Sequence, residues 1–261
     1  MFRLSFFCFY IQVIDLRKSH ASSRVLKFFL YVCRILILFL YSHIEHSISS
    51  KNSYMPMMKS IKDRFEVFGL VDVLSLDHSI KCDIRYATTN NFTGSVLYGE
   101  DMGVYCVPRL AEAVVATNRL LKDIDKNLSI IIFDAARPLS VQKVMFEIVK
   151  GTSQEPYIAN PYKNGGGFHN YALAVDLSIC DSNMNLLNMG TEYDSFQEIA
   201  HTGNEDELLS LGKISLEAYN NRRLLYDITS RSGLTPHPNE WWHYQLSYDD
   251  ADKQRYNLLN F

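Results

Sequence analysis

The strongest constraint on the fold is the short apolar run Leu128–Phe133 (LSIIIF), which is rich in β-branched side chains. Such a run predicts a buried strand, because β-branched residues pack well on a pleated surface. In the preceding stretch, Pro108–Lys122, the apolar residues recur at helical spacing, which predicts an amphipathic helix. With 261 residues, the chain can bury one substantial core and carry an appendage. The two patterns together predict mixed helix and sheet structure around that core.

Similar patterns predict the remaining elements. Helices are expected from a cap at Ser140 to about Val149, and through most of Glu205–Ser232, where Gly233 ends the helix. The glycine-rich stretch Gly151–Gly167 is a predicted loop. Further strands are predicted at Val71–Leu76, Ser79–Ala87, Tyr171–Ile179 and Trp241–Leu246. The expected fold class is α+β, with helices packed on a mostly antiparallel central sheet.

The first 53 residues differ from the rest of the chain. They contain seven Lys/Arg and two Asp/Glu, whereas residues 54–261 contain 19 and 27. The acidic body argues against nucleic-acid binding, which needs a basic face. Basic residues before the apolar stretches Leu4–Ile14 and Val25–Tyr41 favour a secretory signal or membrane anchor. However, the uncharged run Ile35–Tyr41 is far shorter than the ~20 residues that cross a bilayer.

We therefore divide the chain into an N-terminal segment, residues 1–53, and a globular domain, residues 54–261. An upstream extension that is absent from the mature protein is the alternative to a signal or anchor, because Met55, Met57 and Met58 stand just before the globular pattern. An exported or membrane-anchored protein is expected if the segment is a signal or anchor, and a cytoplasmic one otherwise. Membrane association is expected through this segment only.

The five cysteines are an odd number and show no CxxC spacing. Cys82 and Cys106 flank a loop and are able to form a disulfide if the protein is exported. Cys180 follows an apolar strand pattern and is expected to be a buried thiol. None of the cysteines is expected to bind metal.

Three residues have the donor types of a hydrolytic zinc site. Such a site uses three nitrogen or oxygen ligands and leaves one position open. His169 lies at a predicted junction between loop and strand, and Asp176 follows seven residues later within the strand. His243 lies on the last predicted strand. We expect these three side chains to bind one Zn²⁺ per chain.

Two further residues are candidates for catalysis. Glu240 precedes His243 by three residues, and a carboxylate beside the metal can take a proton from water and pass it to a leaving amine. The intervening tryptophans, Trp241 and Trp242, are expected to exclude water from it. Arg137, next to a proline, can stabilise an oxyanion, although a buried Asp134–Arg137 pair is more often structural.

At these residues the sequence resembles the D-alanyl-D-alanine dipeptidase family, the zinc peptidases that include the vancomycin-resistance dipeptidases. The resemblance runs from about Ser79 to Leu246 and rests on several blocks in one order. These blocks are Arg85-Tyr-Ala-Thr with Asn91-Phe-Thr-Gly, Asp134-x-x-Arg137-Pro, His169-x6-Asp176-Leu, Met189-Gly-Thr with Asp194, Asn221-Arg-Arg, and Glu240-Trp-Trp-His243-Tyr.

The resemblance implies a zinc D,D-peptidase fold with a small pocket for a dipeptide. It implies that His169, Asp176 and His243 are the metal ligands, Glu240 the catalytic base, and Arg137 the arginine that stabilises the transition state. It also implies that two further residues, Tyr86 and Asp194, hold the substrate, with Asp194 near its free amino group. A carboxylate there favours a dipeptide, because an acylated N-terminus would leave its charge unpaired.

The chain departs from the family's Ser-x-His-x-x-Gly-x-Ala-x-Asp block at two positions. Gly167 replaces the serine and cannot contribute a side-chain hydrogen bond to substrate. Ala172 replaces the glycine, and alanine is expected to require ordinary backbone angles. Three lone histidines, His78, His201 and His237, are expected to be surface or internally satisfied residues.

Two other functions fit the same motifs. The nearest is a zinc D,D- or L,D-carboxypeptidase or endopeptidase that acts on longer peptidoglycan stem peptides. The other is a zinc-containing peptide-binding protein without turnover, against which the intact Glu240 argues. The sequence leaves open the oligomeric state, and it does not distinguish recycling of cell-wall dipeptides from protection against a glycopeptide antibiotic.

Overall fold

The computed structural model describes residues 60–99, 102–246 and 253–261. The chain divides into two units, Met1–Met58 and Lys59–Phe261, and every described residue belongs to the second. The predictions for residues 1–53 and for the domain boundary fall outside the described residues. Within the described part, no helix has the length and apolar character needed to span a membrane.

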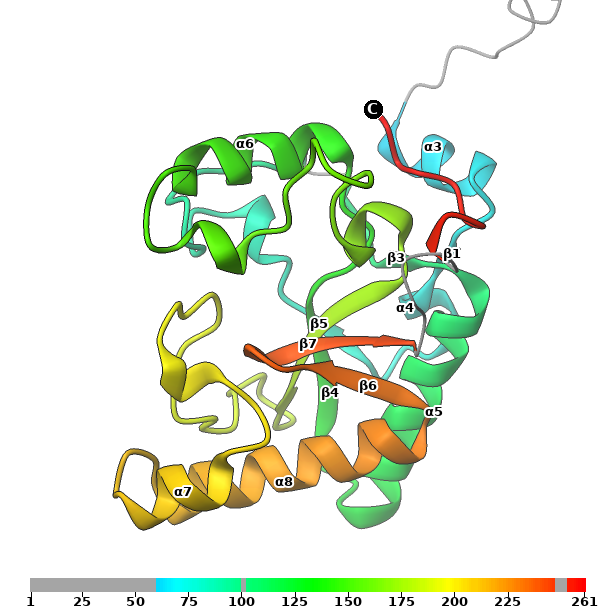
Figure 1. Ribbon diagram of the computed structural model, residues 1–261. Coiled ribbons are helices and arrows are strands. Elements are labelled where there is room, and N and C mark those ends of the chain that lie inside the picture. The colour runs from blue at the N-terminus through cyan, green and yellow to red at the C-terminus, as the bar shows by residue number, and fades with distance from the viewer. Residues whose placement is uncertain (1–59, 100–101, 247–252) are drawn as a thin grey trace, which may run out of the picture. The chain divides into compact units, whose positions relative to one another are not determined.

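The second unit is built on a central sheet of five strands in the order β2-β4-β5-β7-β6 (Figure 1). The strands are β2 (Lys81–Cys82), β4 (Ser129–Asp134), β5 (Ala174–Cys180), β7 (Glu240–Leu246) and β6 (Leu234–His237). Strand β2 runs parallel to β4, and all other neighbours are antiparallel. The predicted α+β class with a mostly antiparallel sheet is confirmed, with one parallel pair at the β2 edge.

Helices and loops cover both sides of this sheet. Helix α5 (Pro108–Ile124) packs against β4 and against α8 (Leu216–Arg231), which also contacts β6. Helix α6 (Leu139–Val149) lies on the other side of the sheet from α8 in Figure 1. Every residue of β4 and of β5 is buried. A strand covered on both faces reads as a continuous apolar run, which is why the 128–133 pattern identified β4.

The edge elements differ from the predictions. The predicted strand Val71–Leu76 is a two-residue strand, β1 (Val71–Asp72), followed by one helical turn, α4 (Val73–Leu76). The Asp72 carboxylate accepts a hydrogen bond from the Leu74 amide at 3.1 Å, so this residue caps a turn and ends the strand. Strand β1 pairs with β3 (Tyr105–Cys106), which the sequence did not indicate.

The predicted strand Ser79–Ala87 was also too long. It contains β2 and then a 3-10 turn, η1 (Arg85–Ala87). The amide groups of Ala87 and Thr88 donate to the carbonyls of Ile84 and Arg85, so these backbone groups pair within the turn and not with a neighbouring strand. The apolar pattern thus marked burial correctly and misidentified the local backbone structure.

The prediction that Ser140 caps a helix was wrong. Helix α6 begins one residue earlier, at Leu139, and its N-cap is Pro138. The free amide groups at its start donate instead to the C-terminus of the chain, from Leu139 to Leu259 O at 2.8 Å and from Ser140 to Phe261 O at 3.3 Å. A distant segment therefore supplies the cap that a local serine was expected to provide.

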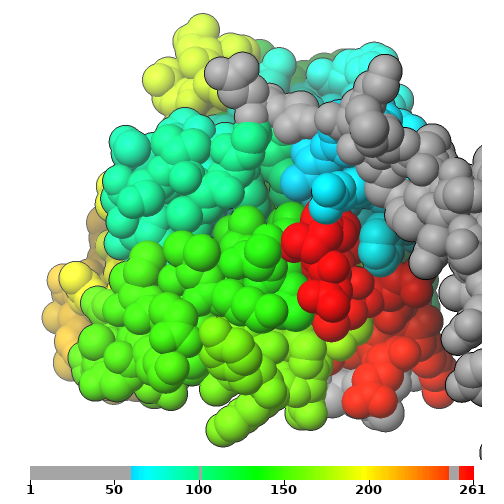
Figure 2. All heavy atoms as spheres, turned by 90° about the horizontal axis from the view of Figure 1, so that it is seen from above, coloured from blue at the N-terminus to red at the C-terminus, as the bar shows by residue number. Residues whose placement is uncertain are grey.

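The C-terminal residues fill a gap between α6 and α3 (Ile61–Val67), as the space-filling view in Figure 2 shows. The Phe261 ring lies 5.9 Å from the ring of Phe65 and 5.7 Å from that of Phe68, between centroids. The Arg64 guanidinium lies 5.1 Å from the same ring centroid. These contacts join the two ends of the described unit.

The C-terminal half contains a break that was not predicted. The stretch Glu205–Ser232 forms two helices, α7 (Glu205–Ser210) and α8, separated at Gly212, whose φ of +66° suits glycine. Ser215 caps α8 by accepting a hydrogen bond from the Ala218 amide at 3.1 Å. Gly233, with φ of +81°, follows the end of α8 as predicted.

The last two strands form a hairpin, of which only the second strand was predicted. The predicted strand Tyr171–Ile179 begins later, at Ala174, because Phe168–Tyr171 forms a 3-10 turn, η3. Two more such turns are η2 (Glu155–Tyr157), inside the predicted 151–167 loop, and η4 (Glu198–Ala200).

Cys82, Cys106 and Cys180 are free thiols, so the structure contains no Cys82–Cys106 disulfide, and Cys180 is buried as expected.

Candidate active site

The three predicted metal ligands come from the centre of the sheet and the turn that leads into it. Asp176 on β5 and His243 on β7 are paired across neighbouring antiparallel strands. Directly paired residues project to the same face of a sheet, so their side chains meet. His169 lies in η3, which immediately precedes β5. All three are buried, with 4%, 2% and 8% of His169, Asp176 and His243 exposed.

The donor atoms of these residues form a nearly equilateral triangle. His169 Nε2 lies 3.1 Å from His243 Nδ1, and each of the two nitrogens lies 3.2 Å from Asp176 Oδ1. Tetrahedral zinc with bonds of about 2.0–2.1 Å would hold its ligand atoms about 3.3 Å apart. The spacing and the donor set of two imidazoles and one carboxylate therefore fit a divalent metal.

Neighbouring groups orient each donor. His169 Nδ1 lies 2.7 Å from the Ala135 carbonyl oxygen, to which it donates, so Nε2 is left as the free donor atom. Tyr193 donates to Asp176 Oδ2 at 2.9 Å, which leaves Oδ1 for the triangle. His243 Nε2 lies 3.3 Å from Gln245 Oε1. In each of the three residues, the nitrogen or oxygen that does not belong to the triangle thus already has a hydrogen-bond partner.

The electrostatics of the triangle suit metal binding. Burial lowers the pKa of His243 below its ordinary value, and the neighbouring His169 adds to the decrease, although the contact with Asp176 opposes it. Burial alone would raise the pKa of Asp176, but the two imidazoles outweigh it and hold this pKa well below its ordinary value. Metal ligands must be deprotonated, and both groups meet that requirement.

Glu240, the first residue of β7, lies beside the triangle. Its Oε2 is 3.6 Å from His243 Nδ1. Burial raises the pKa of Glu240 well above its ordinary value, and repulsion from Asp176 and Asp194 adds to the increase. Trp242 lines the same pocket as Glu240, whereas Trp241 lies outside that lining and donates through its indole nitrogen to Thr191 Oγ1 at 2.8 Å. Only one of the two tryptophans therefore covers the site.

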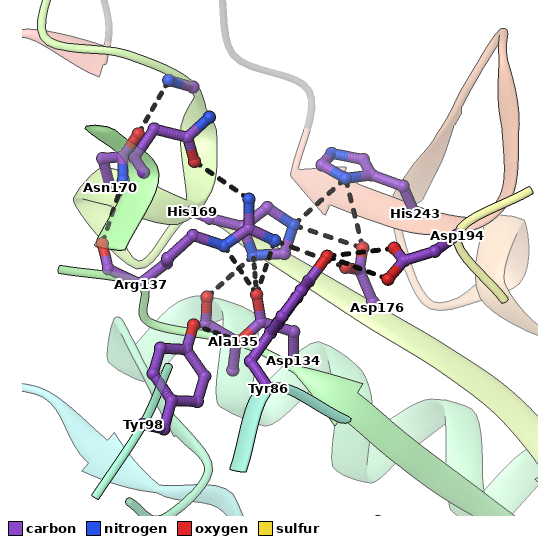
Figure 3. A network of polar contacts seen from close by, with 12 residues as sticks. Tyr86, Tyr98, Asp134, Ala135, Arg137, His169, Asn170, Asp176, Asp194 and His243 are labelled. Carbon is purple, nitrogen blue, oxygen red and sulfur yellow. Dashed lines mark hydrogen bonds and ion pairs between the residues drawn. The ribbon is translucent and has the colours of Figure 1, made fainter. Parts of the chain in front are cut away.

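Arg137 follows β4 and is held by neighbours on several sides (Figure 3). Its Nε donates to Asp134 Oδ2 at 2.8 Å, and its Nη1 donates to Gln142 Oε1 at 2.9 Å. A third nitrogen, Nη2, also bonds to Asp134 and lies 3.7 Å from Asp176 Oδ2. The Asp134–Arg137 pair thus fixes the guanidinium next to the triangle of donor atoms.

Tyr86 and Asp194 meet beside Arg137, whose guanidinium carbon lies 5.2 Å from the centroid of the Tyr86 ring (Figure 3). The Tyr86 hydroxyl donates to Asp194, with Oδ1 at 3.0 Å and Oδ2 at 3.1 Å, and the Phe92 amide donates to Oδ2 at 3.2 Å. Burial raises the pKa of Asp194 to about 7, and Asp176 contributes to the increase. The side chain therefore changes charge near neutral pH.

The seven candidate site residues line one pocket of about 480 Å³. They are Tyr86, Arg137, His169, Asp176, Asp194, Glu240 and His243. A separate hollow of about 310 Å³ beside α8 contains none of them. The structure thus brings together side chains that are up to 157 positions apart, from Tyr86 to His243.

The sequence did not indicate several other residues of the pocket. His237, set aside as a lone histidine, is paired with Glu240 across the β6–β7 hairpin, and its ring centroid lies 5.2 Å from that of His243. Burial lowers the pKa of His237 to about 4, so it is neutral. Tyr157 belongs to the 151–167 loop, where no sequence pattern marked it. The one sequence feature that could have marked His237 as a pocket residue is its position three residues before Glu240.

The two departures from the family pattern have different structural consequences. Gly167 lines the pocket with an ordinary φ of −88°, and an added Cβ would meet only Ala159 Cβ, at 3.0 Å. Ala172 has a φ of +55°, so the expectation that alanine requires ordinary backbone angles was wrong. Its amide donates to the His169 carbonyl at 3.0 Å, and this closing turn imposes the left-handed conformation.

Comparison with known proteins relates the chain to a family. The chain is similar to proteins named D-alanyl-D-alanine dipeptidase from three bacteria. It is 25% identical to that of Escherichia coli, over 68% of this chain and 84% of the relative. The values are 26% for that of Enterococcus faecium and 25% for that of Enterococcus faecalis, each over 65% of this chain and 87% of the relative.

A family model described as D-ala-D-ala dipeptidase matches residues 66–259. This range contains both sheets and every residue of the candidate site. The chain therefore belongs to the D-ala-D-ala dipeptidase family of metallopeptidases.

Proposed function

We propose that this protein is a zinc-dependent dipeptidase that hydrolyses D-alanyl-D-alanine. One observation carries the proposal: three donor atoms form a 3.1–3.2 Å triangle inside a pocket, with a carboxylate 3.6 Å from one of them. The three relatives named D-alanyl-D-alanine dipeptidase support the choice of substrate. His169, Asp176 and His243 would hold one zinc ion.

Zinc bound there would supply a Lewis acid for the scissile carbonyl and lower the pKa of water to about 7. Glu240 accepts the proton of the attacking water as its oxygen bonds to the carbonyl carbon. The same carboxyl then donates this proton to the nitrogen of the leaving D-alanine as the C–N bond breaks. A raised pKa suits both roles, because the group must accept and release a proton near neutral pH.

Arg137 stabilises the negative charge that develops on the carbonyl oxygen. Its guanidinium is held by Asp134 and Gln142 before substrate arrives, so it needs no reorganisation during the reaction. The backbone on both sides is also fixed, since the Arg137 amide donates to the His169 carbonyl and its own carbonyl accepts from Asn170. The first of these bonds joins the arginine backbone to His169, one of the proposed metal ligands.

Asp194 and Tyr86 bind the free amino group of the dipeptide. The Asp194 carboxylate, oriented by the Tyr86 hydroxyl and the Phe92 amide, pairs with the substrate ammonium. An ammonium in the pocket favours the ionised form of Asp194. A peptide with an acylated N-terminus has no such charge and would leave this carboxylate unpaired, which costs about 1–3 kcal/mol.

The direct test is release of D-alanine from D-Ala-D-Ala by purified protein that contains one zinc ion per chain. We expect turnover with zinc and little without it. Zinc content and D-alanine are measured on the same sample. Absence of D-alanine at high concentrations of the zinc-loaded protein would rule out the dipeptidase. Faster cleavage of N-acylated D-Ala-D-Ala than of the free dipeptide would favour the carboxypeptidase alternative.

A further inference from the structure

Two hollows of the molecule share one lining residue, Tyr157. The first is the active-site pocket of about 480 Å³. The second, of about 560 Å³, is lined by residues from two loops, 153–157 and 195–198. Tyr157 is the only residue common to both sets. Its half-buried side chain therefore borders both the site and an outer hollow of similar size.

Side-chain contacts between the two loops hold this ring in place. The centroid of the Tyr157 ring lies 5.6 Å from that of Phe196, with the planes at 73°. The Tyr157 hydroxyl lies 3.2 Å from His201 Nε2. Phe196 in turn packs edge-on against Phe92, at 5.3 Å between centroids. We call the packed rings of Tyr157 and Phe196 the aromatic barrier. Its one polar contact is that between Tyr157 and His201.

The barrier stands next to the group that we propose to bind the substrate amine. Asp194 lines the active-site pocket, whereas Ser195 and Phe196, the next two residues, line the outer hollow. Phe92, which packs on Phe196, also donates its amide to the Asp194 carboxylate. A residue added before the first D-alanine would therefore extend from Asp194 toward the aromatic barrier.

We infer that Tyr157, packed on Phe196, determines substrate length by closing the site at the N-terminal side of the dipeptide. Tyr157 lines the pocket and, in this proposal, does not touch the reacting atoms of the dipeptide. Its role is therefore to select substrates by length and not to take part in catalysis. Removing the ring would join the two hollows and make room for an acyl group or another residue. This inference rests on the proposed function, because it assigns a direction to the bound dipeptide.

The test compares two substrates in the zinc-loaded protein. For the wild type and Tyr157→Ala, kcat/KM is measured with D-Ala-D-Ala and with N-acetyl-D-Ala-D-Ala. We expect the ratio of the acylated to the free substrate to rise about tenfold or more in the variant, the range that pocket size alone achieves in selecting substrates. Phe196→Ala removes the other side of the barrier and is expected to raise the same ratio.

Two matched variants control for the loop itself. Tyr157→Phe keeps the ring and loses the contact with His201, so the ratio should stay near the wild-type value. Tyr162→Ala removes an exposed aromatic residue that lies in the same loop and lines neither hollow. An unchanged ratio in both Tyr157→Ala and Phe196→Ala, with normal zinc content and D-Ala-D-Ala activity, would overturn the inference. Loss of the proposed function would appear differently, as a wild-type protein inactive on D-Ala-D-Ala.

Discussion

The sheet centre and the two loops of the pocket wall contribute different things to the site. Strands β5 and β7 supply Asp176 and His243, which are both buried and are paired with each other across the sheet. The loops supply Asp194 and Tyr157, whose side chains are half-buried and are held by a few side-chain contacts. Two of the three groups that we propose to hold the metal at fixed distances lie on strands, whereas the groups that we propose to select the substrate lie on loops. Selectivity can therefore change without disturbing the metal site.

The largest effect is expected from a substitution among the donor residues at the centre of the sheet. Asp176→Ala removes one of three donors and leaves two imidazoles without the charge that balances a divalent ion. We expect zinc content to fall close to zero and D-alanine release to fall to background. Asp227→Ala, at an exposed ion pair on α8, is the matched control and should retain both. Full zinc content in Asp176→Ala would contradict the assignment.

The next largest effect is expected at Glu240, which lies on the same strand, β7, as His243. A substitution there tests proton transfer separately from metal binding. Glu240→Gln keeps the size of the side chain and removes its ability to take a proton. We expect kcat to fall by about 10²–10⁴ while zinc stays near one ion per chain. Metal analysis and steady-state kinetics on one preparation give both values. If zinc is lost together with activity, Glu240 supports the metal and our role for it is wrong.

A smaller, pH-dependent effect is expected on the loop side. The pKa of Asp194 is raised to about 7, so its carboxyl is mainly neutral below that pH and cannot pair with an ammonium. KM for D-Ala-D-Ala should therefore decrease as the pH rises through about 7, until the substrate amine itself loses its proton near about 8.

Asp194→Asn provides the comparison for this pH dependence. Removing the charge should raise KM about 10- to 100-fold above pH 7, corresponding to the 1.5–3 kcal/mol of a hydrogen bond to a charged group. The decrease of KM through pH 7 should disappear, and zinc content should not change. A KM profile identical to that of the wild type would show that Asp194 does not bind the amine.

The smallest effect is expected at the junction between the two regions. Ala172 adopts a φ of +55° directly before β5, and glycine would relieve about 1 kcal/mol of strain there. Because the methyl group is fully buried, its loss costs about 0.8 kcal/mol. We expect the free energy of unfolding of Ala172→Gly to differ from the wild type by less than about 1 kcal/mol in denaturant titrations. A larger loss would mean that the methyl group is part of the core packing.

The central elements were predictable because burial and periodicity coincide there. Strand β4 reads as a continuous apolar run and α5 as an amphipathic helix, and both lie within a residue or two of the predicted bounds. At the sheet edge, burial continues while the backbone turns, so Val73–Leu76 and Arg85–Ala87 were mistaken for strands. Apolar patterns report burial, and only paired backbone groups make a strand.

The sequence by itself determined which side chains we propose for the chemistry. Residue type and order single out two imidazoles, a carboxylate donor, Glu240 and Arg137, because few side chains can bind zinc or move a proton near neutral pH.

Tertiary structure alone decided what lies around them. The cap of α6 comes from Phe261, the left-handed turn falls on Ala172, and the wall of the pocket comes from Tyr157. These features depend on contacts between segments far apart in the chain, which leave no periodic or local signal in the sequence.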